Sequence, residues 1–199
     1  MSIEDERMAT AAPTQPPSTP STVLMTAEEF ARLHGGDYVE LVRGHVVEQT
    51  MPFPKHGKIC NNTAYYITSH AFAHDSGHVM TNDSFVRTER NPDTVRGADI
   101  SYWSYDRLPK GPIPEGLLSV APDLTVEVRS PSDRWKLVIE KVGEYLEAGV
   151  RVVIVLDPQA ATAHIYRKGE LPQIFDNGDD LLVPDVLPGF AVPVAKLFE

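Results

Sequence analysis

The stretch from residue 124 to residue 156 constrains the fold more than any other part of the sequence. Residues 124–128 (LTVEV) form a short, largely β-branched run between two prolines, which is typical of a buried strand. An amphipathic helical pattern follows and ends at Gly149, a residue suited to the first position beyond a helix. Residues 152–156 (VVIVL) are again apolar. This order of strand, helix and strand predicts a right-handed parallel βαβ crossover at the centre of a sheet.

Shorter signals predict the elements around this unit. Thr26-Ala27-Glu28-Glu29 has the form of a capping box, and Arg43-Gly44 is suited to a hairpin turn. Ser132 or Asp133 is expected to cap the central helix. The expected elements are a helix from residue 26, a hairpin at 38–48, a helix at 55–74, strands at 79–88, 98–103 and 162–166, and a short helix at 194–198. The predicted fold is mixed α/β, with a parallel βαβ centre flanked by helices and an antiparallel hairpin.

Composition predicts a single folded domain. The chain has 199 residues and is 42% hydrophobic, which is enough for one core. Residues 1–25 are rich in Pro, Ser and Thr and are expected to form a disordered leader, whereas residues 26–199 form the domain. The chain has one cysteine and no run of about 18 apolar residues. We therefore expect a cytoplasmic protein with no internal disulfide and no membrane segment.

The net charge narrows the classes of function. A formal charge of -10 argues against a module that binds nucleic acid constitutively, because such modules usually present a basic surface. The same charge is compatible with an enzyme whose acidic site needs a divalent cation before a phosphate group can approach.

Glu127 is the carboxylate that most requires an explanation. It lies between Val126 and Val128 in the most apolar predicted strand. A buried carboxylate must be protonated, paired with a basic side chain or bound to a metal, because an isolated buried charge is strongly unfavourable. The glutamate also stands near the carboxyl end of a parallel strand, where ligand crevices form in α/β sheets. An ion pair and a metal site are both consistent with this position.

The motifs around Glu127 resemble those of a known family. Residues 122–132 (PDLTVEVRSPS), 141–145 (KVGEY) and 148–150 (AGV) look like the Uma2 family, also called DUF820, of restriction endonuclease-like proteins. That family belongs to the PD-(D/E)XK nuclease superfamily. The resemblance extends to residues 38–44 (YVELVRG) and 97–100 (GADI), and it covers most of the chain from about residue 26 onward. It implies a restriction-endonuclease-like core.

The resemblance also implies an active site. Asp99 and Glu127 would bind Mg²⁺ or Mn²⁺, and Glu40 would add a metal ligand or a contact to water. Lys141 would orient the attacking water or offset negative charge in the transition state. The alternative for Glu40 is a solvent-facing strand residue, and for Lys141 it is an exposed helix lysine. Lys141 lies four residues from Tyr145, which favours a position along the buried helix face.

Two further residues are accessory candidates. His56 matches a family position near the site, although it could equally be a capping or surface histidine. Arg129 occupies the place, two residues after the strand glutamate, where the superfamily pattern has a lysine. An arginine cannot accept a proton there, but it can contact phosphate. The displaced lysine of Uma2-like sequences corresponds to Lys141.

These observations give a leading function and two alternatives. The leading hypothesis is a Mg²⁺-dependent endonuclease that hydrolyses DNA phosphodiester bonds. The first alternative is a nuclease-fold protein with weak or absent catalysis that acts as a homo-oligomeric binding or regulatory module. The second is a metal-free hydrolase that uses Glu40 and Glu127 as an acid and base pair. We expect a homo-oligomer, specifically a dimer, in either of the first two cases.

Overall fold

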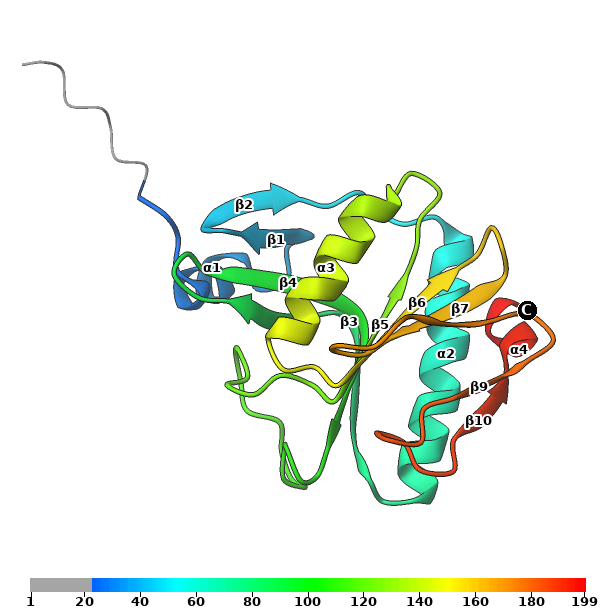
Figure 1. Ribbon diagram of the computed structural model, residues 1–199. Helices are drawn as coiled ribbons and strands as arrows, with labels where there is room; N and C mark the ends of the chain where they lie inside the picture. The colour runs from blue at the N-terminus through cyan, green and yellow to red at the C-terminus, as the bar shows by residue number, and fades with distance from the viewer. Residues whose placement is uncertain (1–22) are drawn as a thin grey trace, which may run out of the picture.

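The computed structural model describes residues 23–199, so most of the leader predicted at residues 1–25 lies outside the described residues (Figure 1). The elements, in chain order, are α1 (Ala27–His34), β1 (Val39–Val42), β2 (His45–Glu48), α2 (Pro54–Ala73), β3 (Gly77–Glu89), β4 (Thr94–Ser104), β5 (Leu124–Val128), α3 (Trp135–Glu147), β6 (Val152–Asp157), β7 (Thr162–Tyr166), β8 (Gln173–Phe175), β9 (Asp180–Leu182), β10 (Ala191–Pro193) and α4 (Val194–Phe198).

The main sheet confirms the predicted mixed topology. Its strand order is β2-β1-β4-β5-β6-β7-β8, with β3 paired to β4, and β9 and β10 form a separate small sheet. The pair β5 and β6 is parallel, with Val126 opposite Ile154, and α3 forms the crossover between them. The other pairs of the main sheet are antiparallel.

The strand β4 pairs with β3 along one edge and with both β1 and β5 along the other. β3 pairs with β4 along nearly its whole length, from Thr94 to Ser104. On the other edge, β1 pairs at Val95, whereas β5 pairs only from Ile100 to Tyr102. The strands β1 and β5 therefore diverge around residues 96–99 of β4. We call this place the fork.

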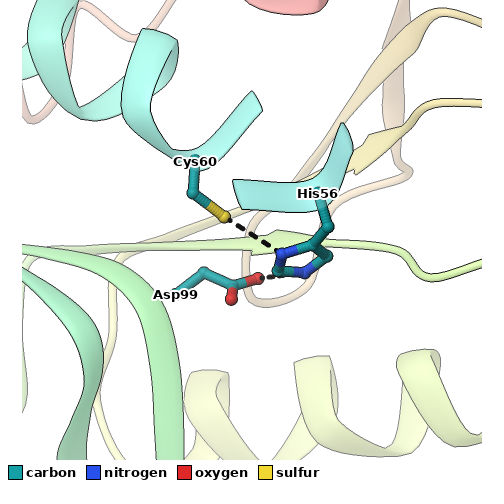
Figure 2. Close-up of side chains that lie close together, drawn as sticks. All are labelled: His56, Cys60 and Asp99. Carbon is teal, nitrogen blue, oxygen red and sulfur yellow. Dashed lines mark hydrogen bonds and ion pairs between the residues drawn. The ribbon is translucent and has the colours of Figure 1, made fainter. Parts of the chain in front are cut away.

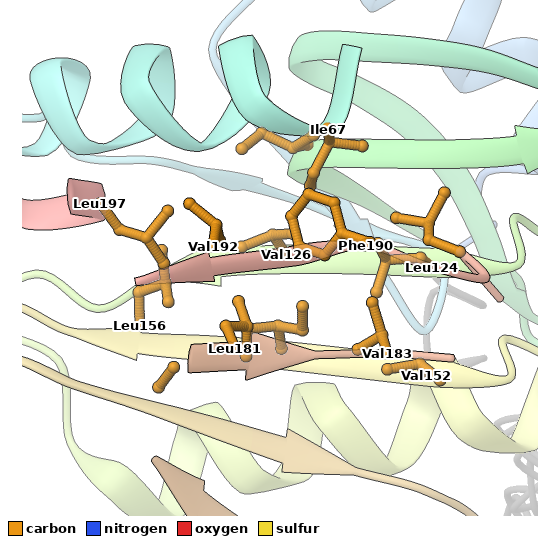
Figure 3. Packing of buried hydrophobic residues seen from close by; sticks show 14 of the residues in the cluster. Ile67, Leu124, Val126, Val152, Leu156, Leu181, Val183, Phe190, Val192 and Leu197 are labelled. Atoms are coloured by element: carbon orange, nitrogen blue, oxygen red, sulfur yellow. The ribbon is translucent and has the colours of Figure 1, made fainter. Parts of the chain in front are cut away.

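Helices cover both faces of the sheet. In Figure 1, α2 and α3 lie on opposite sides of it. On the α2 side, the largest apolar cluster joins Ile67 to Leu124 and Val126 of β5, and the C-terminal strands and α4 close it (Figure 3). On the α3 side, Val142 and Tyr145 are buried against β6. This burial of both faces explains why β5 and β6 read as continuous apolar runs.

Local signals at the element ends are mostly confirmed. Thr26 and Glu29 form the capping box of α1. Arg43 and Gly44 have φ values of 49° and 80°, as a tight hairpin turn of the primed type requires. Gly149 follows the C-cap of α3 with a φ of 97°, in the left-handed region that glycine tolerates.

The predicted cap of α3 is wrong. The helix begins at Trp135, and its N-cap is Arg134, which makes no side-chain capping bond. Asp133 instead accepts a hydrogen bond from the Ser130 amide at 2.7 Å. This local bond holds a turn ahead of the helix, and it occupies the carboxylate that was expected to cap.

Candidate active site

A pocket of about 310 Å³ opens at the fork. Five of the residues singled out from the sequence line it: Glu40, His56, Asp99, Glu127 and Lys141. They come from β1, α2, β4, β5 and α3, elements that are far apart along the chain. The folded chain therefore brings these predicted site residues together in one cavity.

Lys141 lies at the centre of the polar contacts. Its Nζ is 2.9 Å from Glu127 Oε2 and 3.1 Å from Glu40 Oε1. It also donates a hydrogen bond to the Gly97 carbonyl at 3.0 Å. Burial alone would lower the pKa of Lys141, but Glu127, Glu40 and Asp99 outweigh burial and raise it. The side chain is therefore a permanent cation and not the exposed helix lysine of the alternative interpretation.

Asp99 of β4 connects this strand to the end of β5 at the fork. Its Oδ2 accepts a hydrogen bond from the Val128 amide at the end of β5, at 2.7 Å. His56 Nε2 on α2 lies 3.5 Å from the same oxygen. Burial alone would lower the pKa of His56, but the Asp99 carboxylate outweighs this and raises it. His56 is thus a partner of a site carboxylate and does not act as a cap or surface residue.

Glu40 is buried, with 5% of its surface exposed, so the solvent-facing alternative is wrong. Its Oε1 accepts a hydrogen bond from the Gly97 amide at 3.0 Å, and its Oε2 receives one from Arg96 at 2.8 Å. Burial would raise the pKa of Glu40, but Lys141 and Arg96 outweigh it and lower the pKa. Glu40 is therefore an ionised carboxylate that fills the space between β1 and β4.

Glu127 has the most perturbed carboxyl group of the site. Burial raises the pKa of Glu127 to about 7, with Asp99 and Glu40 adding to the effect and Lys141 opposing it. Tyr145 donates a hydrogen bond from its Oη to Glu127 Oε1 at 2.8 Å. Asp99 and Glu40 also line the pocket, so its carboxylates outnumber the ammonium group of Lys141.

Several side chains at the site were not predicted. Arg96 bonds Glu144 of α3 twice, at 2.6 and 2.7 Å, in addition to Glu40. Asp83 lines the pocket from an irregularity in β3, and burial followed by Asp99 raises its pKa. A Cβ on Gly97 would lie 2.9 Å from Asp83, so only glycine permits this approach. Tyr145 alone had a signal in the sequence, since it stands one turn from Lys141 on the buried face.

Arg129 lies apart from the others. It is 8% exposed and donates hydrogen bonds to Asp157 at 3.0 Å and to Gln159 at 2.7 Å. A third bond, from its Nη1 to the Asp133 carbonyl at 3.2 Å, reaches the turn at residues 130–133 that forms part of the pocket rim. Its guanidinium also stacks over Trp135. The structure thus places Arg129 behind the rim and not inside the pocket.

The fold and the sequence agree with known proteins. The fold is nuclease-like: it resembles the crystal structure of a "putative nuclease belonging to DUF820" from Anabaena variabilis, with a TM-score of 0.76 and 23% identity, covering 87% of this chain and 97% of that chain. A sequence model of the Uma2 family, described as "putative restriction endonuclease", matches residues 27–195. The chain belongs to the Uma2 family, which confirms the resemblance seen in its motifs. No curated protein matches the sequence.

Among residues 23–199, none of the helices is long and apolar enough to cross a membrane.

Proposed function

We propose that the protein is an endonuclease that hydrolyses DNA phosphodiester bonds with the help of Mg²⁺ or Mn²⁺. The observation that carries this proposal is that Asp99, Glu127 and Glu40 line one pocket at the fork together with Lys141, which pairs with both glutamates. Membership of the Uma2 family supports the nuclease class.

The residues of the pocket suit a divalent ion. Asp99 and Glu127 would hold it, and Glu40, which is paired with Lys141 and Arg96, would add a ligand or a contact to water. Carboxylate oxygens are the donors that Mg²⁺ and Mn²⁺ prefer. Burial is the main cause of the raised pKa of Glu127, and a dication bound beside this carboxylate would favour its ionised form. When bound, such an ion supplies a water of lowered pKa and offsets the charge of the phosphoryl group.

Lys141 contributes a fixed positive charge. Because its pKa is raised, it does not accept a proton near neutral pH. It therefore orients the attacking water and offsets negative charge that develops on the phosphoryl oxygens. The carbonyl of Gly97 and the carboxylates of Glu127 and Glu40 hold the ammonium in place before substrate arrives. Preorganisation of this kind avoids reorientation during the reaction.

The accessory residues support the carboxylates. His56 contacts Asp99, and Tyr145 contacts Glu127, so each fixes one proposed metal ligand. Arg129 acts through its bond to the 130–133 turn at the rim, where the substrate backbone would enter. The homodimer, the domain limits of 26–199 and the cytoplasmic location stay predictions.

Nuclease assays test the proposal. Plasmid and single-stranded DNA are incubated with Mg²⁺ or Mn²⁺ and the wild type, Asp99→Ala or Glu127→Ala. Asp106→Ala serves as the matched control, because Asp106 is exposed and does not line the pocket. We expect metal-dependent cleavage by the wild type and the control and none by the two site variants. If the wild type neither cleaves DNA with either metal nor binds these metals by calorimetry, the alternative of a binding or regulatory module replaces the proposal.

A further inference from the structure

A second group of metal-binding side chains adjoins the pocket (Figure 2). His56 and Cys60 stand four residues apart on α2, so they share one face of the helix. Asp99 reaches them from β4, as Figure 2 shows. One ligand atom from each of the three residues lies within 4.8 Å of the other two. The chain thus presents a thiol, an imidazole and a carboxylate to one point in space.

The distances suit a tetrahedral ion. Cys60 Sγ lies 3.4 Å from His56 Nδ1, and His56 Nε2 lies 3.5 Å from Asp99 Oδ2. Bonds of about 2.1 Å to nitrogen and about 2.3 Å to sulfur separate these two atoms by about 3.6 Å in a tetrahedral zinc site. The sulfur and the nitrogen therefore already have the spacing that a shared Zn²⁺ requires. Asp99 faces Nε2, the other ring nitrogen, so its carboxylate must turn toward Nδ1 and the sulfur to complete the site.

The donor set differs from that of the proposed catalytic ion. Thiolate and imidazole favour Zn²⁺ and other thiophilic cations over Mg²⁺. The carboxylate of Asp99 lies beside the Cys60 thiol and attracts a dication, which takes the place of the thiol proton. Three protein ligands leave a fourth position for water.

We propose that His56, Cys60 and Asp99 bind Zn²⁺, and that this ion inhibits the enzyme by withdrawing Asp99 from the Mg²⁺ site. The binding half stands on the cluster alone, whereas the inhibitory half rests on the proposed function. Zn²⁺ would compete with Mg²⁺ for Asp99, because this carboxylate cannot bind both ions in one orientation. Nuclease activity would then fall as the concentration of available zinc rises.

Cobalt titration of the full chain tests the binding half. Co²⁺ replaces Zn²⁺ in such sites, and a thiolate ligand gives a charge-transfer absorption band. We expect this band in the wild type, its loss on addition of Zn²⁺, and its absence in Cys60→Ala and Cys60→Ser, with circular dichroism to verify folding. His56→Ala should weaken binding at least tenfold, whereas His45→Ala, on exposed β2, should not. A wild type that binds Co²⁺ without the band, or does not bind it, overturns the site.

Zinc titration of the Mg²⁺-dependent cleavage tests the inhibitory half. Cys60 is not among the residues that line the catalytic pocket. Cys60→Ser should therefore retain cleavage in Mg²⁺ and require at least tenfold more Zn²⁺ for half-inhibition than the wild type. Equal sensitivity of the two proteins would contradict the inhibitory half. If the wild type does not cleave DNA at all, the proposed function and the inhibition fail together, while the cobalt band still decides whether the site exists.

Discussion

The ammonium of Lys141 on α3 lies 2.9 Å from the carboxylate of Glu127 on β5. This pair connects the crossover helix to the strand that precedes it, so the parallel βαβ unit itself positions the two groups. Sequence reasoning left an ion pair and a metal site as alternatives for Glu127. The two are compatible, because Asp99 and Asp83 line the same pocket and can attract a cation beside the Lys141–Glu127 pair.

Replacing Lys141 should slow cleavage strongly without preventing metal binding. Lys141→Met removes the fixed charge near the phosphoryl group, and we expect cleavage to fall by about 10²–10³-fold. Lys136→Met is the matched control, because Lys136 lies on the same helix with 84% of its side chain exposed. Initial rates on plasmid DNA measure the effect. A loss of less than about threefold in Lys141→Met would remove Lys141 from the catalytic group.

Metal binding should strengthen as pH rises through about 7. The folded pKa of Glu127 is raised to about 7, above the ordinary value of 4.5. Its protonated form therefore favours folding below pH 4.5, and this contribution is lost as pH rises through about 7. Since a metal ligand must be ionised, apparent Mg²⁺ affinity should be about tenfold weaker at pH 6 than at pH 8. Thermal melts with graded Mg²⁺ at the two pH values measure this difference.

The control for the pH effect is the comparison of two glutamine variants. Glu127→Gln should lose both the binding and its pH dependence, whereas Glu147→Gln, exposed near the end of α3, should keep both. Equal Mg²⁺ affinity at pH 6 and pH 8 in the wild type would show that Glu127 does not titrate in this range.

Tyr145→Phe should shift the pH profile of cleavage. The Tyr145 hydroxyl donates to Glu127 Oε1 at 2.8 Å, and such a bond favours the ionised carboxylate. Its loss should raise the pKa of Glu127 and move the midpoint of the rate profile up by about one pH unit. Phenylalanine keeps the packing of the buried ring. The control is Tyr65→Phe, which is exposed on α2 and should leave the midpoint unchanged. If the midpoint does not move in Tyr145→Phe either, the hydrogen bond from Tyr145 to Glu127 has a structural role only.

Arg96→Met should destabilise the fold. The guanidinium joins Glu40 of β1 to Glu144 of α3, and its removal takes the basic partner from the half-buried Glu144 and leaves Glu40 with Lys141 alone. We expect the free energy of unfolding in urea to fall by about 3–5 kcal/mol. Adding Glu144→Gln to Arg96→Met should recover part of this loss, because the charge that lost its partner is then removed. The exposed Arg134→Met should change it by less than about 0.5 kcal/mol.

The central fold could be predicted because local signals and burial agree there. The apolar runs that became β5 and β6, with the helical pattern between them, leave few topologies open once the crossover is right-handed. The capping box of α1 and the turn at Arg43-Gly44 depend on neighbouring residues only, and both were found. The cap of α3 was mispredicted because the Asp133 carboxylate can accept a hydrogen bond either from the first turn of the helix or from the Ser130 amide. The amino-acid sequence does not show which of these two donors it pairs with.

The sequence named five residues that line the pocket, but it did not show how they are arranged. Asp99, Glu127 and Lys141 came largely from family motifs, with physical support from the apolar strand and the helix spacing. Arg96 and Asp83 could not be found, because their roles depend on where β1 and β5 diverge from β4. The partnership of Cys60 with His56 and Asp99 likewise exists only after α2 packs against the sheet.

Calorimetric titration with Mn²⁺ tests the central claim most directly, because it separates metal ligation from catalysis. Five proteins are titrated in parallel at pH 8: the wild type, Asp99→Asn, Lys141→Met, the exposed control Asp106→Asn and Cys60→Ser. The last of these lacks the thiol and so removes the second proposed metal site. The account predicts binding by the wild type, Lys141→Met, Cys60→Ser and the control, and none by Asp99→Asn. Unchanged Mn²⁺ affinity in Asp99→Asn would contradict it.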